Sequence, residues 1–293
     1  MELKKTDIEK LKTKLTGGGY IFKNESESKF EFEQTKIFLS TFDRIGLKGC
    51  DIKNSDFTQC VFMDCYARKG IFTNVNFTGS TFVNCNFHGA AFKSCTFKYC
   101  NFQNTDIPDV EIENCLPTEF NLRNDLCRNL KVNYSSLGNK KSSDKYLILE
   151  LEASRKEMYS IFWGETEYYR EKYNVIERFK SFAGWIKLHL DRFFYGHGIH
   201  VWMLLISYLV ISCVLSLVAI IWDAEFIANN SSEAFNPNFA EIWLAVLGES
   251  IKYSFLEIDP FDSFGKLIMY ISRLIGLLYL GLLTATIYRR IAR

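Results

Sequence analysis

Two different hydrophobic patterns divide the 293-residue chain. Between residues 29 and 137, a large apolar side chain recurs every five residues, and a small side chain stands two residues before most of them. From residue 199 onward, long apolar runs replace this pattern. A period of five fits neither an α-helix nor a flat strand, so the repeat predicts a chain that turns a corner every five residues. Its clearest members are Phe57, Phe62, Phe72, Phe77, Phe82, Phe87, Phe92, Phe97 and Phe102.

The five-residue register extends beyond these phenylalanines in both directions. Its other apolar members are Phe32, Ile37, Phe42, Leu47, Ile52, Ile107, Ile112, Leu122, Val132 and Leu137, and its weak members are Ala67, Pro117 and Cys127. The small column holds Cys50, Ser55, Cys60, Cys65, Gly70, Ser80, Cys85, Ala90, Cys95, Cys100 and Cys115. Both columns are expected to point inward and to stack.

This pattern resembles the pentapeptide-repeat family, as the units Cys-Asn-Phe-His-Gly and Cys-Thr-Phe-Lys-Tyr show. The resemblance implies a right-handed quadrilateral β-helix with four units per coil and about five coils, roughly 25 Å long. Each coil of such a solenoid is buried only against its neighbours. We expect a helical N-terminal cap at residues 1–28 and the β-helix at residues 29–138.

The nine cysteines have a structural explanation in this pattern. Most fill the small inward column, and buried free cysteine behaves as a small hydrophobe. The spacing offers no Cys-x-x-Cys pair, so we expect no metal site and no cofactor, and many unpaired thiols indicate a reducing compartment. Between residues 30 and 137 there are 11 basic and 12 acidic residues, which argues against DNA mimicry. No catalytic set stands out, so an enzyme is not expected.

Residues 139–198 are expected to hold a polar linker, a charged helix and an amphipathic helix. In the last of these, Ile176, Phe179, Ile186 and Phe193 lie on one helical face, with basic residues between them. We favour a helix in the membrane interface over one packed on another helix, because an apolar run follows at once. This helix is the predicted lever between the β-helix and the membrane.

Two apolar runs, residues 199–222 and 267–288, predict transmembrane helices of sufficient length. Basic residues precede the first run and follow the second, at residues 289–293, whereas residues 223–264 hold eight acidic residues and one lysine. Both termini are therefore expected in the cytoplasm, with the protein in the cell inner membrane.

Residues 223–266 form the predicted extracytoplasmic loop with a re-entrant pore segment. The layout resembles the pore module of the two-transmembrane potassium-channel superfamily, some bacterial members of which carry pentapeptide repeats. Potassium filters use a glycine-containing loop, and the corresponding stretch here has no glycine, so a wider and less selective cation pore is expected. The predicted pore residues are Ser254, Phe255, Leu256, Glu257 and Asp259. Glu257 and Asp259 form either carboxylate rings or a solvated loop.

The second run holds the predicted gate residues Arg273, Gly276, Gly281, Thr284 and Tyr288. A charged residue within a span needs a partner or water, and Asp259, Asp262 and Glu249 are the candidates for Arg273. The two glycines allow close packing or bending of the helix.

The leading hypothesis is a homo-oligomeric ion channel for monovalent cations, tetrameric by analogy and gated by its cytosolic β-helix. The expected partners are the lipid membrane and a cytosolic ligand or protein on the β-helix. A nucleotide or oligonucleotide messenger, in an anti-phage effector role, is one such ligand. The alternative is a membrane-anchored scaffold in which the β-helix recruits a cytosolic protein and the spans only tether it.

Overall fold

The computed structural model describes residues 16–23, 31–196, 201–222, 247, 251 and 263–291. Within these, the side chains at 16, 31, 195, 201, 216, 219–222, 263–270, 272 and 289–291 are outside the description. The chain divides into two compact units, Met1–Trp185 and Ile186–Arg293, and each is described by itself.

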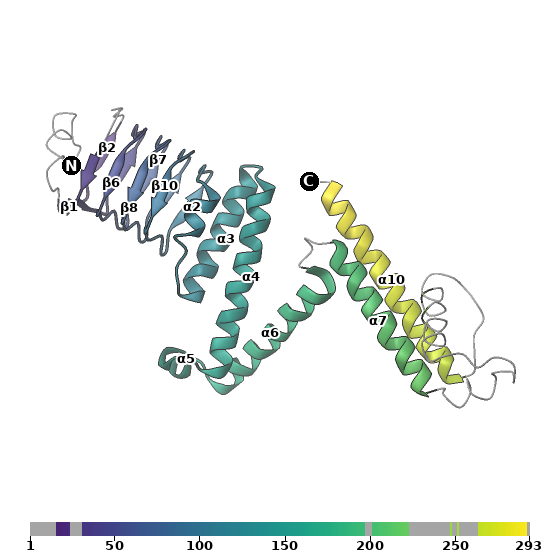
Figure 1. Ribbon diagram of the computed structural model, residues 1–293. Coiled ribbons are helices and arrows are strands. Elements are labelled where there is room, and N and C mark those ends of the chain that lie inside the picture. The colour runs from purple at the N-terminus through teal and green to yellow at the C-terminus, as the bar shows by residue number, and fades with distance from the viewer. Residues whose placement is uncertain are drawn as a thin grey trace. The chain divides into compact units, whose positions relative to one another are not determined.

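A parallel β-helix of about four turns forms the first part of unit 1 (Figure 1). Partner residues in neighbouring coils are 20 apart, as in Phe22↔Phe42, Phe42↔Phe62, Phe62↔Phe82 and Phe82↔Phe102. Twenty residues are four five-residue units, so the predicted four-sided coil is confirmed. The strands are β1 (Thr16–Gly18), β2 (Ile21–Lys23), β3 (Glu31–Glu33), β4 (Lys36–Phe38), β5 (Thr41–Asp43), β6 (Asp51–Lys53), β7 (Val61–Met63), β8 (Ile71–Thr73), β9 (Thr81–Val83), β10 (Ala91–Lys93) and β11 (Asn101–Gln103).

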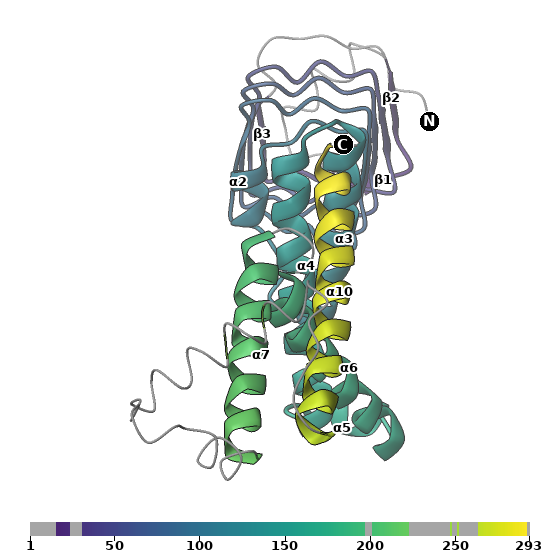
Figure 2. The same ribbon diagram turned by 90° about the vertical axis from the view of Figure 1, so that its right-hand side faces the viewer.

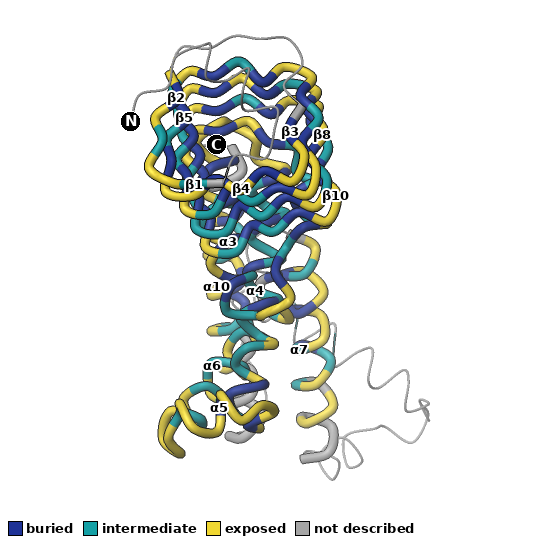
Figure 3. The backbone as a smooth tube through the Cα atoms, turned by 90° about the vertical axis from the view of Figure 1, so that its left-hand side faces the viewer, coloured by how far each residue is buried: buried dark blue, intermediate teal, exposed yellow. Residues whose placement is uncertain are grey.

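The core of the β-helix is a stack of phenylalanine rings. Phe42 lies 4.6 Å from Phe62, centroid to centroid, with the rings 6° from parallel. Phe82 repeats this arrangement with Phe102, at 4.9 Å and 7°. In Figure 3 buried positions therefore recur at regular intervals around each coil. The inward direction of both predicted columns is confirmed from Phe32 to Cys115, whereas Val132 and Leu137 are exposed.

The corners of the coils place ordinary residues in the left-handed backbone region, which costs free energy for most side chains. Asn54, Asn74, Asn84 and Asn104 have φ between 48° and 54°. Asparagine tolerates this conformation better than most residues. Its amide also bonds to the next coil, as in Asn74 Nδ2 to Asn54 Oδ1 at 2.9 Å.

The β-helix begins earlier and ends earlier than the sequence predicted. β1 and β2, within the expected cap, pair with β4 and β5. At the other end, the chain turns helical after Ile107, as α2 (Asp109–Glu113) and α3 (Phe120–Ser136). The prediction of repeats to Leu137 was wrong because helical periodicity takes over in α3, whose buried residues include Leu122, Leu126, Leu130, Asn133 and Tyr134.

The expected polar linker after residue 139 is also absent from the described chain. Helix α4 (Lys140–Trp163) begins there, and the Asn139 side chain caps it by accepting a hydrogen bond from Ser142 N at 3.1 Å. Figures 1 and 2 show α3 and α4 side by side at the end of the β-helix. The short α5 (Glu167–Lys172) and α6 (Val175–Tyr195) follow.

Unit 2 contains α7 (Val201–Trp222) and α10 (Ser263–Ile291), which overlap the two apolar runs at residues 199–222 and 267–288. The two helices lie side by side and antiparallel in Figures 1 and 2, and we call them the apolar helix pair. Among the residues that the structure describes, no helix is both long enough and apolar enough to cross a membrane.

Candidate functional site: the capped β-helix and the apolar helix pair

The cysteine thiols line the interior of unit 1. Eight of the nine are buried, and Cys213 on α7 is half-buried. Inside the β-helix six of the thiols bond to backbone carbonyls, as Cys100 Sγ does with Phe77 O at 2.9 Å. Burial raises the pKa of Cys50 and Cys100 to about 12, so these thiols are neutral and poor nucleophiles. They act as core residues. The described residues hold no cluster of three or more metal-binding side chains.

Two asparagines of α3 close the open edge of the last coil. Asn133 accepts from Thr105 N and donates to Thr105 O, both at 2.8 Å. Asn129 does the same with Phe102, at 2.7 Å from its N and 3.2 Å from its O. A carboxamide presents a carbonyl acceptor and an N–H donor side by side, so it replaces the backbone of a missing coil. The cap satisfies edge groups that a further coil or another chain would otherwise pair.

Two tyrosines complete this cap. Tyr134 donates its hydroxyl proton to Ile107 O at 2.8 Å, and Tyr146 of α4 donates to Asp109 O at the same distance. Their rings stack 5.3 Å apart, and both are fully buried. The cap therefore attaches both α3 and α4 to the β-helix.

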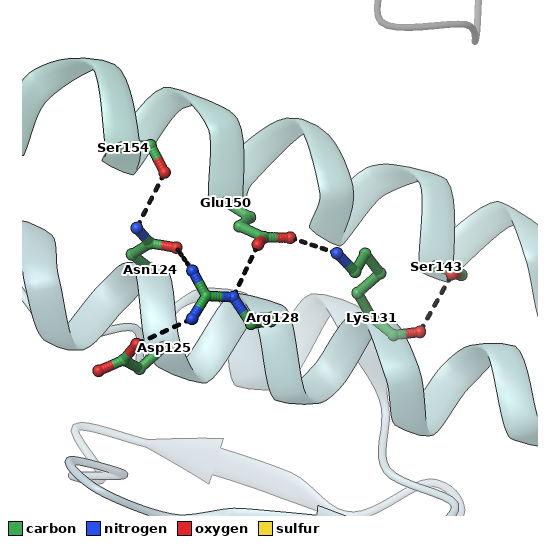
Figure 4. Close-up of polar contacts among 7 residues, drawn as sticks. All are labelled: Asn124, Asp125, Arg128, Lys131, Ser143, Glu150 and Ser154. Carbon is green, nitrogen blue, oxygen red and sulfur yellow. Dashed lines mark hydrogen bonds and ion pairs between the residues drawn. The ribbon is translucent and has the colours of Figure 1, made fainter. Parts of the chain in front are cut away.

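A polar cluster then joins α3 to α4 (Figure 4). The buried carboxylate of Glu150 on α4 accepts from Arg128 Nε at 3.0 Å and from Lys131 Nζ at 2.6 Å. Asn124 Oδ1 accepts a hydrogen bond from Arg128 Nη2 at 3.3 Å, and Asn124 Nδ2 donates one to Ser154 Oγ at 2.8 Å. Two cations neutralise the one carboxylate, and its oxygens are occupied by hydrogen bonds. The cluster has the arrangement of a clamp between helices, and it offers no free nucleophile or base.

In unit 2, a small polar seam holds the apolar helix pair together. Tyr279 of α10 donates to Ser207 Oγ of α7 at 3.1 Å, and Ser207 Oγ lies 3.0 Å from Phe194 O of α6. Ser207 is fully buried, and Leu204, Tyr208 and Tyr279 form the apolar core beside it. The seam orders α6, α7 and α10 against one another within this unit.

The outer faces of the same helices are apolar and exposed. Trp202 is 75% exposed and Leu274 is 68% exposed. Other exposed members are Leu205, Ile206, Leu209, Val210, Val214, Leu217, Val218, Ile271, Leu277, Leu278, Leu280 and Ile287. Soluble monomers rarely expose a continuous apolar surface of this kind.

The predicted pore residues Ser254, Phe255, Leu256, Glu257 and Asp259 lie outside the described residues. Of the predicted gate residues, Gly276 is buried and Arg273 is half-buried, whereas Gly281, Thr284 and Tyr288 are exposed. The hydroxyl of Thr284 bonds to Gly281 O of its own helix at 2.9 Å. The seam residues Ser207 and Tyr279 were missed, because a serine and a tyrosine in apolar runs look like ordinary members of those runs.

The predicted lever residues of α6 share one property. Ile176, Phe179, Ile186 and Phe193 are all exposed, at 68%, 62%, 38% and 45%. Of the four, Phe179 contacts α4, where its ring lies 6.0 Å from that of Phe162. Their location in a membrane interface stays a prediction.

The comparison with protein families matches part of the β-helix. The family described as Pentapeptide repeat region matches residues 35–122. Among solved structures, the pentapeptide-repeat protein Rfr23 from the cyanobacterium Cyanothece 51142 is 10% identical, with a TM-score of 0.29, over 31% of this chain and 76% of its own. A search of curated proteins finds no match to this chain.

Two further solved structures show low-scoring similarity to this chain. One is trypsin-treated QnrB1 R167E, a plasmid-mediated fluoroquinolone resistance protein, at 17% identity and a TM-score of 0.16, over 32% of this chain and 54% of its own. HetL, a pentapeptide-repeat protein from Nostoc sp. strain PCC 7120 involved in heterocyst differentiation regulation, is 9% identical, with a TM-score of 0.09, over 37% of this chain and 83% of its own. The family match does not extend to the apolar helix pair, so the predicted channel module has no support from it. Residues 35–122 are a pentapeptide-repeat domain.

Proposed function

We propose that this pentapeptide-repeat protein is a homo-oligomeric membrane channel, tetrameric by analogy, whose β-helix regulates a weakly selective cation pore. The apolar helix pair embeds in the inner membrane, and both chain ends lie in the cytoplasm.

The observation that carries the proposal is the exposed apolar surface of α7 and α10. The sequence of α7 has no Asp, Glu, Lys or Arg in 22 residues. Its polar groups at Ser207 and Ser212 are buried, whereas the α7 residues Leu205, Leu209, Val210, Val214, Leu217 and Val218 are exposed. This is the reverse of a water-soluble helix pair and suits a lipid environment, in which polar groups must be satisfied inside the protein.

A regulatory role for the β-helix is supported by the continuous structure of unit 1. The cap attaches α3 and α4 to the last coil, and Glu150 clamps α4 to α3. A ligand on the β-helix can shift a pore only by binding its open and closed states with different affinity. A nucleotide-type messenger in anti-phage defence is one ligand that would suit such a sensor.

Membrane insertion has to be tested first, given that no described helix is both long and apolar enough to cross a membrane. The full chain would be expressed in bacteria, and the membranes washed with alkaline carbonate and then floated on a density gradient. Integral behaviour is the expected result. Release by carbonate would refute the pore and leave the scaffold, in which the β-helix recruits a cytosolic protein from a peripheral position.

Conductance is tested in planar bilayers with opposed potassium and sodium gradients. A cation-permeable current without strong potassium preference is expected. Glu257→Gln and Asp259→Asn should lower cation preference if either forms a ring, and Asp223→Asn serves as the matched control. An inserted protein that never conducts, with or without cell lysate, would contradict the pore.

Removal of residues 1–138 tests regulation by the β-helix. The truncated chain should still insert but should conduct, or harm cells, to a different degree. If the truncated and full chains had identical conductance and regulation, the β-helix would have no role in regulating the pore.

A further inference from the structure

The junction of α4 and α6 carries a continuous aromatic surface, which we call the elbow patch: Tyr159, Phe162, Trp163, Phe179, Phe182 and Trp185. Each ring of the patch lies close to at least one other ring of the patch. Trp163 lies 5.1 Å from Phe162, which lies 4.5 Å from Phe182 and 6.0 Å from Phe179. All six residues belong to unit 1.

Much of the elbow patch is open to solvent. Trp163 is 61% exposed, Phe179 is 62% exposed and Tyr159 is 44% exposed. Val175 and Ile176, at the start of α6, extend the apolar surface at 67% and 68% exposure. Burying large aromatic side chains is among the most favourable contributions to folding and binding. A surface that leaves so many of them exposed indicates an apolar contact.

Two guanidinium groups are fixed beside this surface. Helix α4 ends at Trp163, and the next residue, Gly164, caps it in the left-handed conformation that favours glycine, with a φ of 63°. Arg178 donates to Phe162 O at 2.8 and 3.0 Å, and Arg170 donates to Gly164 O at 3.0 Å. These bonds satisfy carbonyls at the end of α4 and use only part of the five donors of each arginine. Positive charge is thereby held at the edge of the aromatic rings.

Exposed aromatic rings beside basic groups complement one surface in particular, that of a bilayer with anionic headgroups. Tryptophan and tyrosine favour the headgroup level, where an apolar ring and a polar tip are both accommodated. Basic residues near an anionic leaflet add about fivefold each to the partition coefficient. A protein partner would supply an apolar surface, but the arginines would then need acidic side chains placed at the α4 terminus.

We propose that the elbow patch is a binding site for anionic lipid, with Trp163 and Phe179 at the acyl boundary and Arg170 and Arg178 on headgroup phosphates. The site rests on the proposed membrane location. It adds that unit 1 itself contacts the bilayer, so lipid composition would influence the helix that joins the two units.

The test uses the full chain in vesicles of phosphatidylcholine with or without about a third of phosphatidylglycerol. A fluorophore is attached at Trp163→Cys in a Cys213→Ser background, where the remaining thiols are buried. The expected result is quenching by brominated lipid and protection from aqueous iodide, both stronger with phosphatidylglycerol. Tyr99→Cys is the matched control, because Tyr99 is a comparably exposed aromatic, at 70%, on the β-helix. It should show the opposite quenching.

A charge variant separates lipid recognition from simple proximity. Arg170→Gln should reduce the phosphatidylglycerol dependence of quenching at position 163 about fivefold. If position 163 is quenched by iodide as freely as position 99, while the chain still resists carbonate, the elbow site is wrong and the membrane proposal stands. If the chain is also released by carbonate, both fail. Equal quenching by brominated lipid in the two vesicle types would refute the anionic preference.

Discussion

The asparagine cap gives a sharp test of how the β-helix ends. Asn133 is 2% exposed, and it is the partner of both the N–H and the C=O of Thr105, a residue with no exposed surface. In Asn133→Ala both backbone groups lose their bonds inside the protein. An unsatisfied buried group costs about 1–3 kcal/mol. Since some water can enter the space left by the amide, we expect a total loss of about 2–4 kcal/mol.

Two variants control for the chemistry. Asn129→Ala removes the equivalent pair of bonds to Phe102, but Asn129 is only half-buried, so water can replace part of them and the expected loss is about 1 kcal/mol. Asn133→Asp keeps an acceptor for Thr105 N but turns the donor toward Thr105 O into a second oxygen. It should therefore cost at least as much as Asn133→Ala.

The assay is urea unfolding of the full chain in mild detergent, followed by far-ultraviolet circular dichroism and analysed by linear extrapolation. The expected order of stability is wild type, Asn129→Ala, then both Asn133 variants. A loss below about 1 kcal/mol for Asn133→Ala, or a loss no larger than that of Asn129→Ala, would refute the view that a side chain replaces the missing coil.

Three further predictions concern the phenylalanine core, the clamp at Glu150 and the buried thiols. Phe87→Ala should destabilise the β-helix by about 3–5 kcal/mol, because Phe87 is 3% exposed between neighbouring rings, and a loss under about 1 kcal/mol in the same assay would place it outside the core. Glu150→Gln should cost about 2 kcal/mol of stability, since it weakens two charge-assisted hydrogen bonds. Asp125→Asn should cost under about 0.5 kcal/mol, because the Arg128–Asp125 pair is exposed and 3.5 Å long, and equal effects of the two variants would contradict the clamp. Alkaline titration should leave the fold stable to about pH 9 and destabilise it above that pH, because burial raises the folded-state pKa of four thiols, those of Cys50, Cys60, Cys100 and Cys127, from 9.0 to about 11 or 12. The unfolded chain then releases these protons first, and each thiol lowers the free energy of unfolding by about 1.4 kcal/mol per pH unit in that window. Constant stability from pH 9 to pH 11 would refute the buried positions of these thiols.

The interior of the β-helix was predictable because its five-residue period can be recognised from residues close together in the sequence. A phenylalanine every five residues requires a corner every five residues, and the small side chains two positions earlier can fill only an inward column. The identity of that column also explained the cysteines, which are buried as predicted. No long-range information was needed for these conclusions.

The ends of the β-helix were decided by tertiary contacts. Leu122 fits the five-residue register, and nothing in its immediate neighbourhood excludes another coil. What ends the solenoid is the set of bonds that Asn129, Asn133 and Tyr134 make with Phe102, Thr105 and Ile107, over 27 or 28 residues of sequence. From the neighbouring sequence alone, Asn129, Asn133 and Tyr134 look like ordinary polar residues of a helix.

The same distinction holds for the helices beyond the β-helix. The sequence by itself determined that α7 and α10 are apolar helices and that α6 has one apolar face, since both follow from the spacing of side chains. Only the tertiary structure paired Ser207 with Tyr279 and joined the rings of α4 to those of α6. Contacts between residues far apart in the chain depend on how whole helices pack, and hydrophobic periodicity specifies the face of a helix but not its partner.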